Sequence, residues 1–186
     1  MTYFDAIKIV AAGAVLAGAA PVFSHVALKT PTAAAASDYQ AVFVVGHGCN
    51  GSPTTAVSVQ IPSGFEAARP EPKAGWAVTT QPARFVRPDG SQGMQGSEIG
   101  AAIWTLVDRE SALGSANANN FILQGKLPGQ PGPLWFKVRQ TCELGESDWS
   151  EIPASGTSTR ELKNPAVLLQ VGPTDSSPHH PPPHRH

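Results

Sequence analysis

The sequence is poor in charge: only 15% of its residues are charged, and 13 Lys and Arg nearly balance 14 Asp and Glu. An average soluble chain carries roughly 25% charged residues. A protein that binds nucleic acid by neutralising phosphates needs a basic surface, and this composition excludes one. Glycine and proline are frequent instead, with 18 of each, which favours short strands and turns over a helical bundle.

Histidine is absent between Gly48 and Pro178. Only His25 and His47 lie in the part of the chain that is expected to fold. The sequence also lacks a G-x-S-x-G nucleophile motif and a glycine-rich phosphate-binding loop between a strand and a helix. Because Ser-His-Asp catalysis needs a histidine positioned beside a nucleophile, we expect neither a hydrolase nor a transferase.

No apolar run is long enough to cross a membrane comfortably, since a spanning helix needs about 20 residues. The shorter run Ile9–Phe23 follows Lys8 and is rich in small residues, which predicts a secretory signal peptide over residues 1–24. Cleavage after Ser24 would leave His25 as the new N-terminus. A start at Ala20 is the alternative, and an uncleaved anchor is a third reading. The mature protein is expected to be periplasmic or secreted.

Cysteine occurs only twice, at Cys49 and Cys142, and without C-x-x-C spacing. In an oxidising compartment two cysteines allow one intramolecular pairing, so we predict a Cys49–Cys142 disulfide. Two thiolate ligands for a soft metal are the alternative.

The body of the chain, residues 25–171, predicts an all-β, immunoglobulin-like β-sandwich of about eight to nine strands. Apolar and polar residues alternate most clearly at Val57–Ile61. Only Arg109–Asn120 is compatible with a helical turn. Residues 172–186 are rich in histidine and proline and predict a disordered tail. The other predicted strands are Ala41–Val45, Ala77–Thr80, Ala83–Val86, Ile99–Leu106, Phe121–Lys126, Leu134–Gln140, Asp148–Ile152 and Ala166–Val171.

A histidine at a free N-terminus offers a metal two nitrogen donors, the α-amine and the imidazole Nδ1, which together close a chelate ring. Copper(II) stands at the top of the divalent affinity order and suits nitrogen ligands. Cleavage before His25 would create this chelate, whereas one extra residue would convert the amine into an amide. His47 lies between Gly46 and Gly48 in a turn-rich loop beside Cys49. Alternatively, His25 simply begins a strand, and His47 is a loop histidine that binds no metal.

Several segments resemble one known family. In order, they are His25-Val26, His47-Gly48-Cys49-Asn50-Gly51-Ser52-Pro53-Thr54-Thr55, Val59-Gln60-Ile61-Pro62, Arg69-Pro70-Glu71-Pro72-Lys73-Ala74-Gly75-Trp76, Gly125-Lys126-Leu127-Pro128, Gln140-Thr141-Cys142-Glu143 and Trp149-Ser150-Glu151-Ile152-Pro153. Together they resemble the YcnI-like copper-binding domain in its proteobacterial form, over about His25 to Leu169.

The resemblance implies an immunoglobulin-like fold, export and a copper(II) site called a single-histidine brace. In that site an N-terminal histidine chelates copper, a carboxylate assists and a tryptophan lies close by. The histidine maps to His25 and the tryptophan to Trp149, which is near the metal but is not a ligand because indole offers only an N–H donor. His47 would occupy the position of the carboxylate. Other possible oxygen donors are Glu143, Glu146 and Glu151, and core packing is expected of Trp76, Trp104 and Trp135.

We therefore expect an exported copper(II)-binding protein that serves copper homeostasis or delivery, has no catalytic activity and has copper-handling proteins of the envelope as possible partners. A metal-free sandwich that binds a protein or a glycan is the main alternative. A copper oxidase of polysaccharides, with His47 as its second histidine, is a third. The tail histidines, His179, His180, His184 and His186, would either gather metal loosely or simply be solvated.

Overall fold

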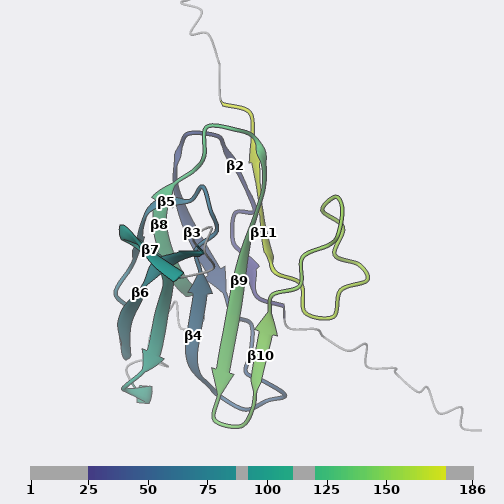
Figure 1. Ribbon diagram of the computed structural model, residues 1–186. Helices are drawn as coiled ribbons and strands as arrows, with labels where there is room; N and C mark the ends of the chain where they lie inside the picture. The colour runs from purple at the N-terminus through teal and green to yellow at the C-terminus, as the bar shows by residue number, and fades with distance from the viewer. Residues whose placement is uncertain (1–24, 87–91, 111–119, 175–186) are drawn as a thin grey trace, which may run out of the picture.

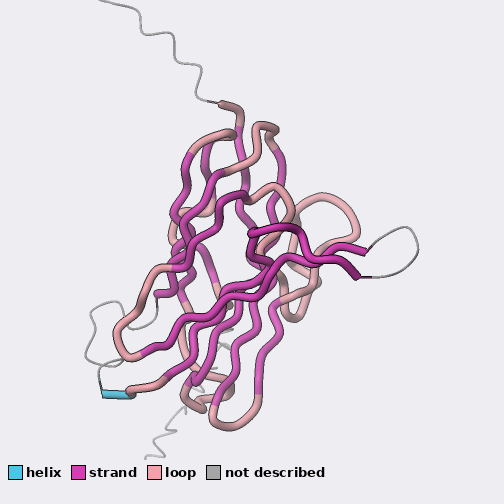
Figure 2. Tube along the Cα trace, turned by 60° about the vertical axis from the view of Figure 1, so that its left-hand side comes forward, coloured by secondary structure: helices cyan, strands magenta, loops and turns pink. Residues whose placement is uncertain are grey.

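The regular structure of the chain is almost entirely β-strand (Figures 1 and 2). The computed structural model describes residues 25–86, 92–110 and 120–174. The predicted signal peptide and most of the predicted tail lie outside these residues. Within the described residues, no helix is long and apolar enough to cross a membrane.

Two sheets form a sandwich. The first sheet has the strand order β1-β3-β8-β5, and the second has the order β2-β11-β9-β4-β7-β6, with β10 paired to β9. The strands of the first sheet are β1 (Ala27–Leu28), β3 (Asp38–Val44), β8 (Asn120–Lys126) and β5 (Glu66–Pro70). The strands of the second are β2 (Thr32–Ala34), β11 (Val167–Gly172), β9 (Gly132–Cys142), β4 (Thr54–Gln60), β7 (Gln92–Leu106), β6 (Trp76–Val86) and β10 (Glu146–Trp149).

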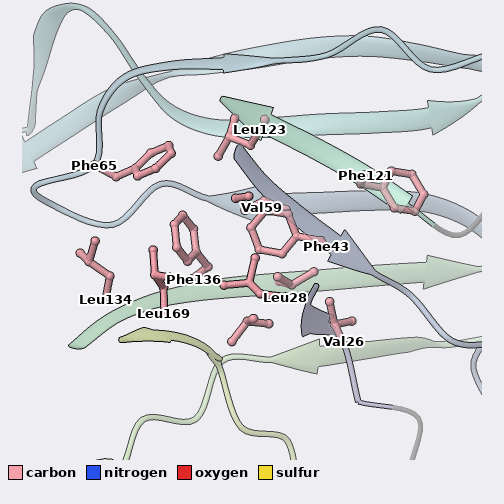
Figure 3. Close-up of a cluster of buried hydrophobic side chains, with 14 of the residues drawn as sticks. Val26, Leu28, Phe43, Val59, Phe65, Phe121, Leu123, Leu134, Phe136 and Leu169 are labelled. Carbon is pink, nitrogen blue, oxygen red and sulfur yellow. The ribbon is translucent and has the colours of Figure 1, made fainter. Parts of the chain in front are cut away.

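The core lies between the sheets because alternate residues of each strand point inward. On β9, for example, Leu134, Phe136 and Val138 are buried, whereas the residues between them are more exposed. Phe136 makes edge-to-face contacts with Phe43 and Phe65. Figure 3 shows these rings in the cluster that fills the sandwich. The predicted all-β fold class is confirmed.

Most predicted strands are present, but three short ones were missed and two were merged. The strands β1, β2 and β5 were not predicted, and Ala77–Thr80 and Ala83–Val86 are parts of the single strand β6. The bulges of β6 at Pro82 explain the apparent break, since they interrupt the alternation. Arg109 and Glu110 are helical, and the rest of the predicted turn up to residue 119 lies outside the described residues.

The tryptophans are divided between the core and the surface. Trp104 is fully buried, and Trp76 packs against the core cluster. The prediction of core packing for Trp135 was wrong. Trp135 lies between Leu134 and Phe136 on β9, so the alternation of the strand turns its side chain to the outer face of the sheet, where it is half-buried.

Candidate metal site

His25 is an exposed residue held in place by the strand that follows it. Val26 and Leu28 are buried in the core, and β1 pairs antiparallel with β3. Figure 3 shows Val26 and Leu28 on the inner side of this strand. The alternation therefore directs His25 and Ala27 outward, which agrees with their exposure.

The ring of His25 contacts Trp149. The centroids of the two rings are 5.4 Å apart and the ring planes meet at 79°, an edge-to-face arrangement. Trp149 is the last residue of β10, whose partner is β9, and its side chain is only 8% exposed. The contact thus joins the segment just before β1 of one sheet to β10 of the other. The structure brings together the two residues that the resemblance paired.

The indole nitrogen of Trp149 has no hydrogen-bond partner among the described residues, although it is buried. The Nε1 atom of Trp76 is also buried without a hydrogen-bond partner among the described residues. A buried donor without a partner costs about 1–3 kcal/mol, so such atoms are uncommon in folded proteins. The donor of Trp149 belongs to the side chain that packs against His25.

His47 follows β3 and begins a loop that turns back to β4. Cys49 and Ser52 close a tight turn in which the Ser52 amide donates to the Cys49 carbonyl at 2.9 Å. The central residues Asn50 and Gly51 have φ angles of 49° and 84°, and Asn-Gly is the sequence that such a turn prefers. The side chain of His47 is exposed, and its Nδ1 atom lies 3.4 Å from the Gly48 carbonyl oxygen.

Gly48 is required by close packing inside this loop. A Cβ atom at this position would lie 1.6 Å from the carbonyl oxygen of Ser52. Only glycine therefore fits between His47 and Cys49 without moving the loop. The histidine is thus attached to a tightly folded segment.

The pairing of β1 with β3 directs the segment before β1 toward the segment after β3. Ala27 pairs with Val44 and Leu28 with Phe43, and the same antiparallel register continued by two residues would set Val26 against Val45 and His25 against Gly46. Val26 and Val45 are both buried, as residues facing each other on the inner side should be. His25 and His47, which are 22 positions apart in the sequence, therefore lie on neighbouring chain segments.

The predicted disulfide is present and anchors the His47 loop. Cys49 and Cys142 are bonded, with a Cα–Cα distance of 6.0 Å, and both are buried. The alternative of two thiolate metal ligands is therefore wrong, because both sulfur atoms are used in the bond. Two backbone donors extend the connection: the Glu143 amide bonds to the Pro53 carbonyl at 2.9 Å, and the Leu144 amide to Ser52 Oγ at 2.8 Å.

Two of the three candidate carboxylates make other contacts, and the third points to another face of β10. Glu143 forms an ion pair with Arg109, and Oε2 of Glu151 accepts a hydrogen bond from the Lys163 amide at 3.0 Å. The second contact helps close the loop that projects between β10 and β11 (Figure 1). Glu146 is exposed on β10, on the face opposite to Trp149. Glu143 and Glu151 are thus engaged in other contacts, and Glu146 is turned away from Trp149.

The described residues contain no group of three or more His, Cys, Asp and Glu side chains that could hold a metal ion. The site expected from the sequence would use the ring nitrogen of His25, the amine of a chain that begins at His25 and the ring of His47. These are three nitrogen donors from two side chains and one chain end, a set that fits copper(II).

One residue near this site was missed by the sequence prediction. Gln140 is on the inner row of β9 and is 2% exposed, and its side-chain Nε2 atom donates to the His47 carbonyl at 2.9 Å. The sequence does mark this residue, because Gln140 continues the alternate series of apolar residues Leu134, Phe136 and Val138.

A polar cleft of about 790 Å³ opens away from this site. It lies between β5 and the β6–β7 ribbon, and its lining includes Gln60, at the end of β4 opposite to the disulfide. Neither His25 nor His47 lines this cleft, and none of the other predicted metal ligands does.

The two sheets and the single disulfide define a disulfide-bonded immunoglobulin-like domain. Among solved structures, the fold is similar to the one titled "Crystal structure of an uncharacterized protein from Nocardia farcinica reveals an immunoglobulin-like fold". The TM-score is 0.54 and the identity 24%, and the match covers 79% of this chain and 97% of that one. No curated protein matches this chain.

The family follows from a direct match. Residues 25–171 match the model described as "Domain of unknown function (DUF1775)", and the chain belongs to this family, which is the YcnI-like domain family. The match begins at His25, the residue predicted to become the N-terminus of the mature protein.

Proposed function

We propose that this chain is an exported protein that binds copper(II) at its mature N-terminus and serves copper homeostasis or delivery in the cell envelope, without catalysis. The contact between His25 and Trp149 carries the proposal. In support, His25 is exposed, begins the family match and lies on the segment beside His47. The disulfide agrees with export, because such bonds persist in oxidising compartments.

Each residue has a defined task in this proposal. His25 supplies the amine and one ring nitrogen, and His47 supplies a further ring nitrogen. Metal binding has to displace the proton of the amine, whose ordinary pKa of about 7.7–8.0 permits this near neutral pH. Trp149 covers one side of His25, which limits access of water and fixes the orientation of the imidazole ring.

The decisive experiment compares two N-termini. Mature protein that starts at His25 should bind one copper(II) tightly, whereas a chain with one added glycine before His25 should bind at least tenfold more weakly, because its amine has become an amide. Both chains should carry asparagine in place of the four tail histidines, so that the tail does not bind copper. Equal affinities would refute the proposed chelate.

The ligand set can be tested separately by electron paramagnetic resonance. The copper-loaded chain should show three nitrogen donors, and His47→Ala should remove one of them. An unchanged spectrum in His47→Ala would reject His47 as a ligand and favour a carboxylate.

Mass spectrometry of the exported protein shows whether the chain starts at His25 or Ala20. Oxygen consumption by the copper-loaded chain with a reductant would contradict a non-catalytic role.

A further inference from the structure

We infer that Gln140 is a positioning residue of the copper site, which holds the backbone of His47 so that its imidazole is presented to the metal. This inference rests on the proposed function. Apart from aromatic side chains, Gln140 is the one buried polar residue among the residues whose burial the structure describes. It stands in the inner row of β9, between Val138 and Cys142, where an apolar side chain would be expected.

The amide of Gln140 connects the two ends of the His47 loop. Its Nε2 atom donates to the His47 carbonyl at 2.9 Å and to Oγ1 of Thr54 at 2.7 Å. His47 begins the loop and Thr54 begins β4. An NH2 group has two N–H donors, and these two bonds use both of them. One side chain on β9 therefore holds the entry and the exit of the loop.

The burial of this amide requires an explanation. Removing an amide from water costs free energy unless its hydrogen bonds are replaced, and an apolar residue of the same length would fill the space without that cost. The stability of the core therefore does not explain why glutamine, and not an apolar residue, occupies this position. The specific property that methionine or leucine would lack is a pair of donors aimed at the His47 carbonyl and at Thr54.

Three other contacts attach the later part of the loop to β9 and to the residues that follow it. The disulfide holds Cys49, the Glu143 amide holds Pro53, and the Leu144 amide holds Ser52. All three act beyond His47, on the part of the loop that returns to β4. Without the Gln140 amide the loop would stay attached through these contacts, but the hydrogen bond from β9 to the His47 carbonyl would be lost.

Residues that orient a metal ligand typically change metal affinity by 10–100-fold when they are replaced. Gln140→Met keeps the length of the side chain and removes both donors. We therefore expect Gln140→Met to lower the copper(II) affinity by about 10–100-fold. Its electron paramagnetic resonance spectrum should lose the nitrogen signal that His47→Ala also loses. A purely structural role would lower the unfolding midpoint and leave the spectrum of the folded, copper-loaded protein unchanged.

Thr54→Val is the matched control, because it removes one acceptor of the same amide and leaves the bond to His47. It should change the copper affinity less than threefold. The double variant Gln140→Met, His47→Ala should bind copper no more weakly than His47→Ala alone, since both changes remove the same ligand. Additive losses in the double variant would overturn the inference.

Gln140→Asn provides a second test if Gln140→Met does not fold. It keeps the amide but shortens its reach by one methylene, so the same loss of one nitrogen signal is expected. Wild-type copper binding with unchanged spectra in the folded variant would overturn this inference alone. A wild-type chain that binds no copper at His25 would overturn the proposed function and this inference with it.

Discussion

The disulfide between Cys49 and Cys142 should supply a large part of the stability of the domain. The two cysteines are 93 positions apart. In the chain-entropy model a cross-link over a loop of this length stabilises the fold by about 4–5 kcal/mol, because it restricts the unfolded chain. Domains of this size are commonly stable by only 5–15 kcal/mol. The double variant Cys49→Ala, Cys142→Ala should therefore lose about a quarter or more of its stability.

The effect should appear mainly in the unfolded state. The Pro53 carbonyl and Ser52 Oγ keep their backbone partners on the far side of the bond in the variant, so the folded loop retains other attachments. The unfolded chain, in contrast, expands when the cross-link is removed. The urea dependence of the unfolding free energy should therefore become steeper, since more surface is exposed on unfolding.

Urea unfolding at neutral pH measures both quantities. Wild-type protein reduced by a dithiol is the matched control, because it differs from the oxidised form only in the bond itself. The variant and the reduced protein should lose similar amounts, and their melting temperatures should fall by roughly 10–20 °C. A loss below about 1 kcal/mol in both would refute the reasoning from loop length.

Two further predictions concern single residues. Burial raises the pKa of Tyr39 to about 12, and its hydroxyl donates to the Thr30 carbonyl. The folded state therefore retains this proton more tightly than the unfolded state, and up to about 3 kcal/mol of stability, fully present below pH 10, should be lost between pH 10 and 12. Urea unfolding at pH 9 and pH 11.5 should show a smaller loss in Tyr39→Phe, and equal losses would contradict this. Gly48→Ala places a Cβ atom against the Ser52 backbone and should lower the melting temperature more than Gly51→Ala. Gly51 has open space around it and only the roughly 1–2 kcal/mol cost of its positive φ; the reverse order would show that the loop relaxes.

Strands with a clear alternation were predictable from the sequence, and strands defined by their partners were not. Residues 57–61 alternate between apolar and polar side chains, and β4 covers most of them. The strand β1 has only two residues and exists because β3 offers it a pairing edge. In β5 the alternation is broken by a bulge next to Ala67, whose φ of 49° is unusual for alanine.

The site was predictable in its parts but not in its arrangement. The position of His25 after an apolar leader indicated a chelating terminus, and the resemblance added Trp149. Their contact requires β1, which pairs with β3 in the first sheet, to lie close to the end of β10, which forms a hairpin with β9 in the second. No local pattern specifies which edges of the two sheets meet. Gln140 carried a local signal, but its meaning depends on the loop that folds over it.

The candidate site depends on both sheets, and this explains how His25 is held in place although it precedes β1. In the proposed mature protein His25 is the terminal residue, and terminal residues are usually poorly ordered unless they are tied down. Val26 and Leu28 are each more than 90% buried, and burial of such side chains stabilises by about 1.5–3 kcal/mol each. This anchors β1 in the first sheet, while Trp149 contacts His25 from the second. Because His25 is one residue from this anchor, its ring and backbone nitrogen are positioned by the core itself.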